Sequence, residues 1–509
     1  MKRRYQQGTE RCSMKLLPPS IDDYVSQDNP VRVIDAFVDS LDLSEMGFIN
    51  SSGELKAGQP AYDPADLLKL YIYGYINRIR SSRRLEHESQ RNLELIWLIK
   101  ELKPSYKTIS DFRKNNPEAL KKVNKDFVLF CRDLELLGGE FVAIDGAFFN
   151  GNASKHSILT ENKIKKNLER IENAISDYLS KLDETDNSDE TPFGKAFDVK
   201  EKLEQLKKKR LTFENHRKEL LQSKEKQLSQ TDPDARLLVK SGQKVAGYNI
   251  QIAVDEKHKL IVESEVTSDG NDSAQLYPMA SKSKNTLGVK ELIAAADAGY
   301  YQQEQIKNCV DEGIIPYIKK PNKSFVAKKQ GRFTRDDFVF EAENNRYKCP
   351  KGQYLSCVGT EINRGKTAIR YKSSTSTCRN CSLKAKCLPA KTLYRQIHRW
   401  EHEEIIENHD KRMAEYGDTA MKKRGAIVEH PFGTLKLWCG WTHFLVRGRK
   451  KVSGEWSLLM FCYNFKRVLN ILGGHKFREI LAKRLELFRG VDVKFIYHLN
   501  LFVKTCYLA

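Results

Sequence analysis

Apolar residues along the chain follow two different spacings, and the first region, residues 1–137, has the spacing of helices. Tyr62, Asp63 and Pro64 are a helix N-terminal signal, and the following stretch ADLLKLYIYGYI predicts a strongly apolar helix. The stretches SSRRLEHESQRNLELIWLIKEL, ISDFRKNN and PEALKKVNKDFVLFCRDLELL continue the helical pattern. Short helices that are joined by tight turns and carry Arg and Lys are typical of a helix-turn-helix DNA-binding domain. The alternative is an ordinary helical bundle with a solvated basic face.

From residue 138 to residue 320 the pattern alternates between strands and helices. The apolar run at the start of FVAIDGAFFN predicts a buried strand that ends at Asp145. The stretch GYNIQIAVD, in which apolar and polar residues alternate, and the stretch LIVESEVTS predict a hairpin beside it. A helix over residues 272–283, the strand in LIAAADAGY that ends at Asp297, a helix over residues 302–312 and the strand IIPYIKK follow. This order predicts an α/β fold with one mixed sheet flanked by helices.

A charged segment, residues 155–235, interrupts this alternation. Its apolar residues recur every three or four positions in two series, separated by the polar stretch DETDNSDETPFG. The first series is Ile164, Leu168, Ile171, Ile175, Tyr178 and Leu182, and the second is Val199, Leu203, Leu206, Phe213 and Leu220. Two such series around a polar break predict an antiparallel helical hairpin inserted between strands. The hairpin could dimerise, brace DNA or act as a spacer.

Residues 321–395 are rich in cysteine. Cys349, Cys378, Cys381 and Cys387 have spacings that suit a tetrahedral zinc site, with Cys357 as a spare. A structural zinc ion would hold a polar segment in shape without a large apolar core. The alternative is a group of buried, reduced thiols. The chain has 11 cysteines and no secretory signal, which indicates a reducing cytosol.

The region from residue 396 to residue 475 carries a late acidic residue, Glu429. Val428, Phe432 and Leu435 share one helical face, and Lys436 follows Glu429 by seven positions. Because proline is best tolerated in the first turn of a helix, Pro431 predicts that this helix begins near Glu429. The stretch EWSLLMFCYNFKRVLNIL predicts a buried helix, because it is apolar nearly all round. The sequence of residues 476–509 has no pattern that predicts a role.

The charge of the chain indicates a polyanionic partner. Its 509 residues include 87 Lys and Arg against 67 Asp and Glu, a formal net charge of +20. A balance this basic favours nucleic acid, and no apolar run is long enough to span a membrane. The basic residues Arg83, Arg84, Arg91 and Lys107 lie in the predicted helical domain and are candidates for DNA contact.

Three acidic residues are candidates for a metal site. Asp145 and Asp297 each follow an apolar run, and Glu429 comes from a later helix. Carboxylates on adjacent core strands can converge on a divalent cation, since Mg²⁺ is usually held by one or two carboxylates together with phosphate oxygens. The alternative for each acid taken singly is the capping of a turn or a helix.

At these motifs the chain resembles the DDE-type transposases of bacterial insertion sequences. The resemblance rests on IDGAFFNGNASK around Asp145, GYNIQIAVD, ADAGY around Asp297 and VEHPFGTLK around Glu429. The N-terminal stretches YDPADLLKLYIYGYI and TISDFR resemble the helical domain that precedes the catalytic core of these enzymes. The resemblance covers roughly residues 15–472.

The resemblance implies an RNase H-like catalytic core of the retroviral-integrase superfamily behind an N-terminal helical DNA-binding domain, residues 1–137. The core would comprise residues 138–320, with the hairpin insertion at 155–235, and residues 396–475; the cysteine-rich insertion, 321–395, would separate its two parts. The implied activity is cut-and-paste DNA transposition, with Mg²⁺- or Mn²⁺-dependent strand cleavage and strand transfer. The implied partners are the terminal inverted repeats and target DNA, bound by a homodimer in the bacterial cytoplasm at the nucleoid.

The resemblance also implies residue roles. Asp145, Asp297 and Glu429 would bind two Mg²⁺ ions, and Lys436 and Arg424 would hold the DNA backbone. Lys436 has the spacing common in related transposases, whereas Arg424 stands one place off the common spacing, and no Tyr stands at the expected position before Glu429. Two other functions compete with transposition: a metal-dependent nuclease that cuts without joining, and a decayed transposase that only binds DNA.

Overall fold

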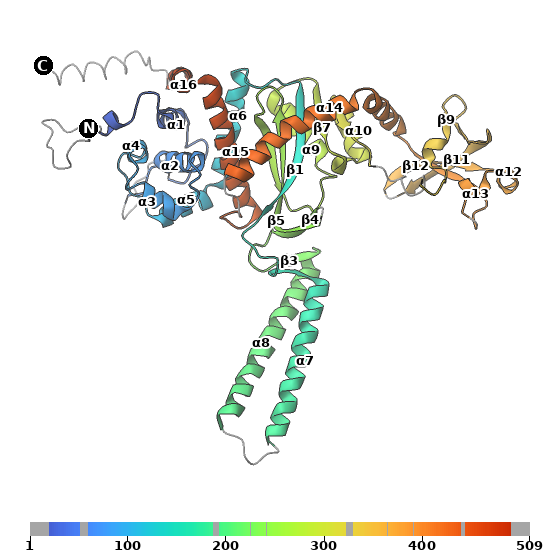
Figure 1. Cartoon of the computed structure of the whole chain (residues 1–509), viewed down its shortest axis with the longest axis horizontal. Coiled ribbons are helices and arrows are strands. Elements are labelled where there is room, and N and C mark those ends of the chain that lie inside the picture. Colours follow the sequence, from blue (N-terminus) through green and yellow to red (C-terminus); the bar gives the residue numbers. More distant parts are fainter. Residues whose placement is uncertain are drawn as a thin grey trace, which may run out of the picture.

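The computed structural model describes residues 20–50, 60–186, 193–223, 225–240, 242–321, 329–363, 365–389, 391–438 and 443–489. Figure 1 shows a central sheet with helices packed on it, a group of short helices on one side and a small second sheet on the other. A pair of long helices projects away from the central sheet. Among the described residues, no helix combines the length and apolar character that crossing a bilayer requires.

The N-terminal region folds into short helices, as the sequence predicts. They are the 3-10 helix η1 (Ile21–Tyr24) and the helices α1 (Pro30–Asp39), α2 (Pro64–Ile76), α3 (Ser82–Glu88), α4 (Leu93–Leu98), α5 (Tyr106–Asn115) and α6 (Pro117–Asp133). Asp63 caps α2, because its side chain accepts a hydrogen bond of 2.8 Å from the backbone N–H of Ala65. Asn92 caps α4 in the same way, so the chain divides into two helices between Glu88 and Leu93.

The central sheet is mixed and has a long first strand. Its strands are β1 (Phe141–Asn150), β4 (Arg236–Lys240), β5 (Gln243–Asp255), β6 (Ile261–Thr267), β7 (Leu292–Ala296) and β8 (Ile314–Ile318). They lie in the order β4-β5-β1-β7-β8, with β6 also paired to β5. β1 runs antiparallel to β5 and parallel to β7, and β7 is parallel to β8. The predicted mixed sheet flanked by helices is confirmed.

Two details of β1 and β5 differ from the sequence-based prediction. The strand predicted to end at Asp145 continues to Asn150, because β5 pairs with it from Val142 through Asn150. Asn249 and Gln251, which the alternation placed on a polar face, are fully buried. β5 is therefore covered on both faces, and its polar residues point into the protein.

The helices on the sheet follow the predicted order, with different bounds. α9 (Leu276–Leu287) begins later than the predicted residue 272, and α10 (Gln303–Asp311) follows η2 (Ala298–Tyr300). The prediction that a helix begins near Glu429 is wrong, because α14 (Glu403–Trp438) contains Pro431 in its interior. Proline removes one backbone hydrogen bond from a helix, but α14 packs along β1, β7 and β8, and this tertiary packing outweighs that loss.

The predicted hairpin is formed by α7 (Glu161–Asp186) and α8 (Phe193–Ser223), which lie side by side and project from the sheet (Figure 1). The short strands β2 (Ile158–Thr160) and β3 (Gln227–Ser229) pair at its base. Leu159, Ile164 and Leu220 form a small buried core there. The central part of the polar break, residues 187–192, and the side chains of Leu182 and Val199 lie outside the described residues.

The cysteine-rich region forms a second, antiparallel sheet. Its strands, in the spatial order β13-β12-β11-β10-β9, are β9 (Val339–Glu341), β10 (Arg346–Lys348), β11 (Tyr354–Asn363), β12 (Lys366–Ser373) and β13 (Gln396–Trp400). The short helical elements η3 (Arg335–Asp337), α12 (Thr375–Arg379) and α13 (Lys384–Cys387) border it. This sheet has its own small core of Phe338, Tyr347, Leu355, Tyr371 and Ile397.

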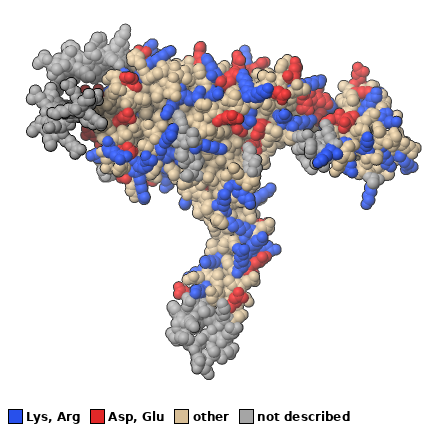
Figure 2. Space-filling model, viewed as in Figure 1, with Lys and Arg blue, Asp and Glu red and all other residues tan. Residues whose placement is uncertain are grey.

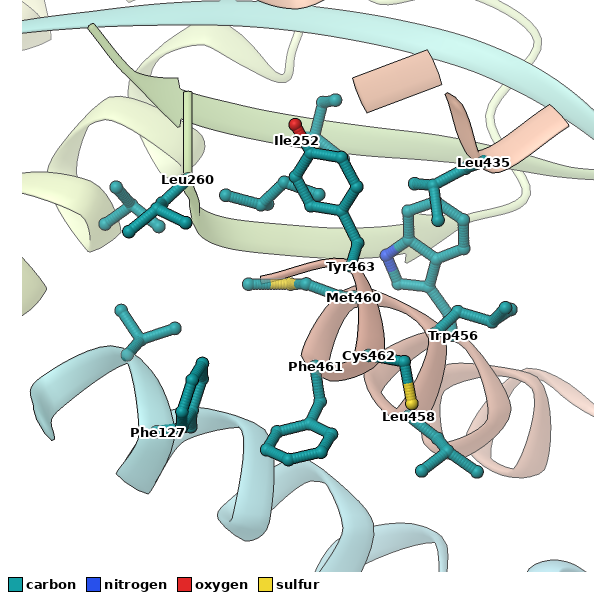
Figure 3. Close-up of a cluster of buried hydrophobic side chains, with 14 of the residues drawn as sticks. Phe127, Ile252, Leu260, Leu435, Trp456, Leu458, Met460, Phe461, Cys462 and Tyr463 are labelled. Carbon is teal, nitrogen blue, oxygen red and sulfur yellow. The ribbon is translucent and has the colours of Figure 1, made fainter. Parts of the chain in front are cut away.

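α15 (Arg449–Leu472) joins the N-terminal helices to the central sheet, and α16 (Gly474–Arg489) follows it against α1. The predicted buried helix is thus confirmed, since the side chains of α15 from Val452 to Phe465 are buried. Figure 3 shows why: Phe461 of α15 points toward Phe127 of α6, while Tyr463 points toward Ile252 of β5. One hydrophobic core therefore contains residues of the N-terminal helices and of the sheet.

A buried carboxylate on α15 stabilises this junction. Glu455 is fully buried and lies 3.0 Å from the Arg80 guanidinium and 3.9 Å from that of Arg113, and it accepts a hydrogen bond from the backbone N–H of Leu445. Burial alone would raise the pKa of the Glu455 carboxyl, but the charges of Arg113 and Arg80 hold that pKa below its ordinary value. Two cations of the N-terminal region, Arg80 between α2 and α3 and Arg113 on α5, thus share one carboxylate of α15 as their partner.

We expect Glu455→Ala to lower the free energy of unfolding by about 3–5 kcal/mol, because it removes the shared partner of two buried guanidinium groups. Urea unfolding at neutral pH measures this loss. The matched control is Glu479→Ala on α16, whose exposed side chain should contribute less than about 0.5 kcal/mol. Since its folded-state pKa is lowered, the contribution of Glu455 should disappear as the pH falls through that pKa. Equal losses in the two variants would contradict this account of the junction.

Candidate active site

Two of the three predicted acids are placed by neighbouring parallel strands. The pairing of β1 with β7 ends at Ala143 opposite Ala295. Asp145 follows two residues later on β1, and Asp297 follows two residues later, directly after the end of β7. Since neighbouring strands lie about 4.8 Å apart, this register brings the two acids to the same edge of the sheet. Asp297 also caps η2, because it accepts a hydrogen bond of 2.8 Å from the backbone N–H of Gly299. Capping and metal binding are thus compatible roles for this side chain.

α14 brings three further predicted residues, Arg424, Glu429 and Lys436, to the same edge. The Arg424 side chain is largely buried, and its Nη2 lies 2.8 Å from Oδ1 of Asp145. Its Nε donates a hydrogen bond of 3.3 Å to the backbone carbonyl of Ile144. Arg424 therefore attaches α14 to β1 at the position of the first acid.

The acids face a common open cleft with a volume of about 650 Å³. Its lining includes Asp145, Asp297, Arg424, Glu429 and Lys436. Lys436 is exposed, and its Nζ lies 5.5 Å from the ring centre of Phe149, within the range of a cation–π interaction. The cleft therefore combines three carboxylates with two cationic side chains, which can approach a phosphate backbone.

The donors in this cleft suit a hard cation. Carboxylate oxygens are the protein ligands that Mg²⁺ and Mn²⁺ prefer, and three carboxylates face this cleft. Within the described part of the chain, no three His, Cys, Asp or Glu side chains are gathered into a group that could hold a metal ion as they stand. The Asp145 carboxylate is instead paired with Arg424. Cation binding would therefore require the acid side chains to turn toward one another.

The four basic residues predicted for DNA contact lie elsewhere, on the N-terminal helices. Arg83, Arg84, Arg91 and Lys107 are all exposed, and the helices α3 and α5 that carry three of them are neighbours. The Arg83 guanidinium lies 5.2 Å from the ring centre of Tyr106, which is also exposed. Arg91 forms an ion pair with Glu88. These residues are thus available to a partner but form no part of the cleft lining.

The four predicted cysteine ligands line one cavity, although in their described conformations they do not form a group that could hold a metal ion. Cys349, Cys378, Cys381 and Cys387 line one small apolar cavity of about 30 Å³ beside the second sheet. Burial raises the pKa of the Cys387 thiol, and the other three cysteines are close enough to add to this effect. Cys349 Sγ accepts a hydrogen bond of 3.3 Å from the backbone N–H of Gln353. Cys357 is exposed on β11, as expected of a spare.

Sequence reasoning missed a polar layer that lies behind the cleft. Asn249, Gln251 and Tyr300 have no exposed surface, and Asp272 is 5% exposed. Their side chains are joined by hydrogen bonds, including those of 2.7 Å from Asn249 and Gln251 to Asp272. The sequence did contain a signal of this layer: two amide residues, Asn249 and Gln251, stand between strongly apolar residues of the same strand. Alternation of apolar and polar residues is typical of a strand with one solvated face, whereas both faces of β5 are covered.

Comparisons with known proteins give two family matches and one match to a solved structure. The family described as "Transposase domain (DUF772)" matches residues 19–115, and the family described as "Transposase DDE domain" matches residues 223–465. Asp297 and Glu429 lie within the second match, and Asp145 lies between the two. Among solved structures, the cryo-EM structure of piggyBac transposase synaptic complex with hairpin DNA matches with a TM-score of 0.32 and 10% identity, covering 90% of this chain and 79% of that one. No curated protein matches the chain.

Two separate parts of the chain, residues 19–115 and 223–465, thus match transposase domain families. The second match, over the mixed sheet flanked by helices, makes the chain similar to the DDE-type transposases. The resemblance predicted from the sequence motifs is thereby confirmed.

Proposed function

We propose that the chain is the transposase of a bacterial insertion sequence, which binds transposon ends and catalyses cleavage and transfer of DNA strands. The observation that carries this proposal is the common cleft of Asp145, Asp297 and Glu429, supplied by two parallel strands and one helix. The two transposase domain matches support the same activity. A bacterial cytoplasmic location at the nucleoid is part of the proposal, as is action as a homodimer on the paired terminal inverted repeats and the target DNA.

Asp145, Asp297 and Glu429 would hold two divalent cations, Mg²⁺ or Mn²⁺. When bound, such ions activate a water molecule or a 3′-hydroxyl and stabilise the leaving oxygen in an in-line displacement at phosphorus. Asp145 and Asp297 would supply ligands from the edge of the sheet, and Glu429 would supply one from α14. Arg424, now paired with Asp145, would turn to a DNA phosphate as Asp145 turns to a cation. Lys436, which also lines the cleft, would hold the DNA backbone.

Two regions outside the cleft would make different kinds of contact with DNA. Residues 1–137 would recognise transposon ends through Arg83, Arg84, Arg91 and Lys107, because exposed residues on short helices can reach both the groove and the phosphates. Figure 2 shows Lys and Arg side chains on the hairpin near the end where it meets the sheet. The exposed basic residues of that part of α7 and α8 include Lys165, Lys166, Arg170, Arg217 and Lys218. These would add affinity without sequence preference, since phosphate neutralisation carries no base information.

The cysteine cavity would hold one structural zinc ion through Cys349, Cys378, Cys381 and Cys387. The backbone N–H of Gln353 donates a hydrogen bond to Cys349 Sγ, which orients one of these side chains within the cavity. The ion would stabilise the polar edge of the second sheet, whose own apolar core has few residues. Buried, reduced thiols remain the competing interpretation of the same cavity.

The first test concerns the three acids. Asp145→Asn, Asp297→Asn and Glu429→Gln should each reduce Mg²⁺-dependent cleavage of a labelled end duplex by about a hundredfold or more, because each removes a proposed metal ligand. Binding of the same duplex, measured by gel shift, should stay within about twofold, since no phosphate contact is lost. The exposed Asp311→Asn serves as the matched control and should behave as the parent protein. Near-normal cleavage by one variant would remove that residue from the site.

Strand transfer separates a transposase from a nuclease. A labelled end with a free 3′-hydroxyl should become joined to a supercoiled target, and the three acid variants should fail at this step as well. Cleavage without any joined product would favour the nuclease alternative. Binding without either reaction in the parent protein would favour a decayed transposase.

The zinc proposal is tested by metal content. Protein purified without added zinc should contain one zinc ion per chain, and Cys381→Ser should lose both the metal and several degrees of thermal stability. Cys357→Ser, whose thiol is exposed outside the cavity, should keep both. Well-folded parent protein without stoichiometric zinc would leave the reduced-thiol interpretation.

End recognition is tested in the full chain, because the N-terminal helices share their core with α15. The double variant Arg83→Ala with Arg84→Ala should lose preference for end DNA over a scrambled duplex. The double variant Lys165→Ala with Lys166→Ala should weaken binding of both duplexes equally and reduce the slope of log affinity against log salt by about 2. If the arginine variant also weakens both duplexes equally, the assignment of end recognition to these residues is wrong.

A further inference from the structure

Asp272 lies in the loop between β6 and α9 and is buried behind the proposed active site. Its Oδ1 accepts hydrogen bonds of 2.7 Å from both Asn249 Nδ2 and Gln251 Nε2. Both amides belong to β5, the strand that pairs with β1 around Asp145. The direction of the Gln251 amide is fixed from its other end, since the Tyr300 hydroxyl donates a hydrogen bond to Gln251 Oε1. These four side chains form one connected polar layer.

This layer lies directly against the backbone that carries two of the acids. Gly146 follows Asp145 and pairs with Gln251, and a Cβ atom there would lie 2.3 Å from Gln251 Nε2 and 2.8 Å from Asp272 Oδ1. Gly299 follows the Asp297 turn, and a Cβ atom there would lie 2.9 Å from Asp297 Oδ1 and 3.8 Å from Asp272 Oδ2. Asp272 therefore lies between the two segments that position Asp145 and Asp297.

The electrostatic setting of Tyr300 supports this placement. Burial is the main cause that raises the pKa of the Tyr300 hydroxyl well above its ordinary value, and the charges of Asp272, Asp145 and Asp297 add to it. A buried carboxylate this close to two others is costly by itself, because like charges repel in a low-dielectric environment. A divalent cation in the cleft would reverse the sign of that interaction.

We propose that Asp272 is a positioning residue of the cation site: it holds the Asn249–Gln251–Tyr300 layer against Gly146 and Gly299, and its charge raises the affinity of the cleft for divalent cations. This inference rests on the proposed site of Asp145, Asp297 and Glu429, and it adds a fourth carboxylate that acts without lining the cleft. The amides of Asn249 and Gln251 orient Asp272, and Asp272 in turn fixes the position of the backbone at Gly146 and Gly299, beside the two acids.

Substitution of Asp272 by asparagine separates charge from geometry. The Asn oxygen can still accept both amide hydrogen bonds, whereas the negative charge is gone. We expect Asp272→Asn to weaken Mn²⁺ binding about tenfold, measured as free Mn²⁺ by electron paramagnetic resonance, with an unchanged or higher melting temperature in the absence of metal. The Mg²⁺ concentration that half-saturates cleavage should rise by a similar factor, while the rate at saturating Mg²⁺ should fall less than about threefold.

Asp255→Asn is the matched control, since Asp255 is likewise a buried carboxylate. It is the last residue of β5 and makes none of the hydrogen bonds of the polar layer. It accepts backbone N–H bonds from Gly138 and Gly139, so its variant should lose thermal stability and keep the Mn²⁺ affinity of the parent. Tyr300→Phe frees one end of Gln251 and should weaken Mn²⁺ binding in the same direction as Asp272→Asn, by a smaller factor.

Asp145→Asn distinguishes this inference from the proposed function. If Asp145→Asn abolishes Mn²⁺ binding and Asp272→Asn leaves it unchanged, the role of Asp272 is overturned and the metal site stands. If Asp272→Asn weakens Mn²⁺ binding only as far as it lowers the melting temperature, Asp272 is structural and the inference fails. If Asp145→Asn has no effect on Mn²⁺ binding, the proposed metal site itself is wrong. Loss of affinity at unchanged stability, with recovery of cleavage at high Mg²⁺, supports the proposal.

Discussion

The burial of α15 is the constraint on which the rest of the structure depends. A helix that is apolar nearly all round must be covered on all sides, and here α6 and α2 cover one side while β6 and α14 cover another. Phe127 and Phe461 pack edge to face with ring centres 5.0 Å apart, and this contact joins the N-terminal helices to the helix that lies on the sheet. The DUF772 region and the DDE region therefore share one core, and motion between them would expose it.

The position of the cleft follows from the unequal pairing of β1. β5 pairs with β1 as far as Asn150, whereas β7 leaves it after Ala143. Beyond that point β1 is held on one edge only, and the space on its other edge is bordered by the Asp297 turn and by α14. Asp145 is thus supported by a paired strand and still reaches an open cleft. A loop could not hold its backbone as firmly.

The sequence predicted those features that depend on local pattern. The apolar periodicity of α2 and α15, the two series of α7 and α8, and the strands that carry Asp145 and Asp297 all fall where the pattern placed them. The bounds that depend on tertiary contacts could not be found in this way. Pro431 should begin a helix by local rules, yet the packing of α14 on the sheet keeps it in the interior. Likewise, alternation cannot show that both faces of β5 are covered, so the burial of Asn249 and Gln251 could not be predicted.

The buried polar residues of β5 mark a part of the molecule where the requirements of stability and of function are different. A polar residue in a strand covered on both faces costs free energy unless every hydrogen bond is made, and apolar residues of similar size would fill that space at lower cost. The layer formed by Asn249, Gln251, Asp272 and Tyr300 meets this condition by mutual hydrogen bonds, and it does so directly behind the two strand acids. Departures from local consistency that are this well satisfied are expected near functional sites. The chain thus keeps its polar core residues where fixed charge and fixed backbone serve the chemistry. It uses α15, none of whose residues lines the cleft, for stability.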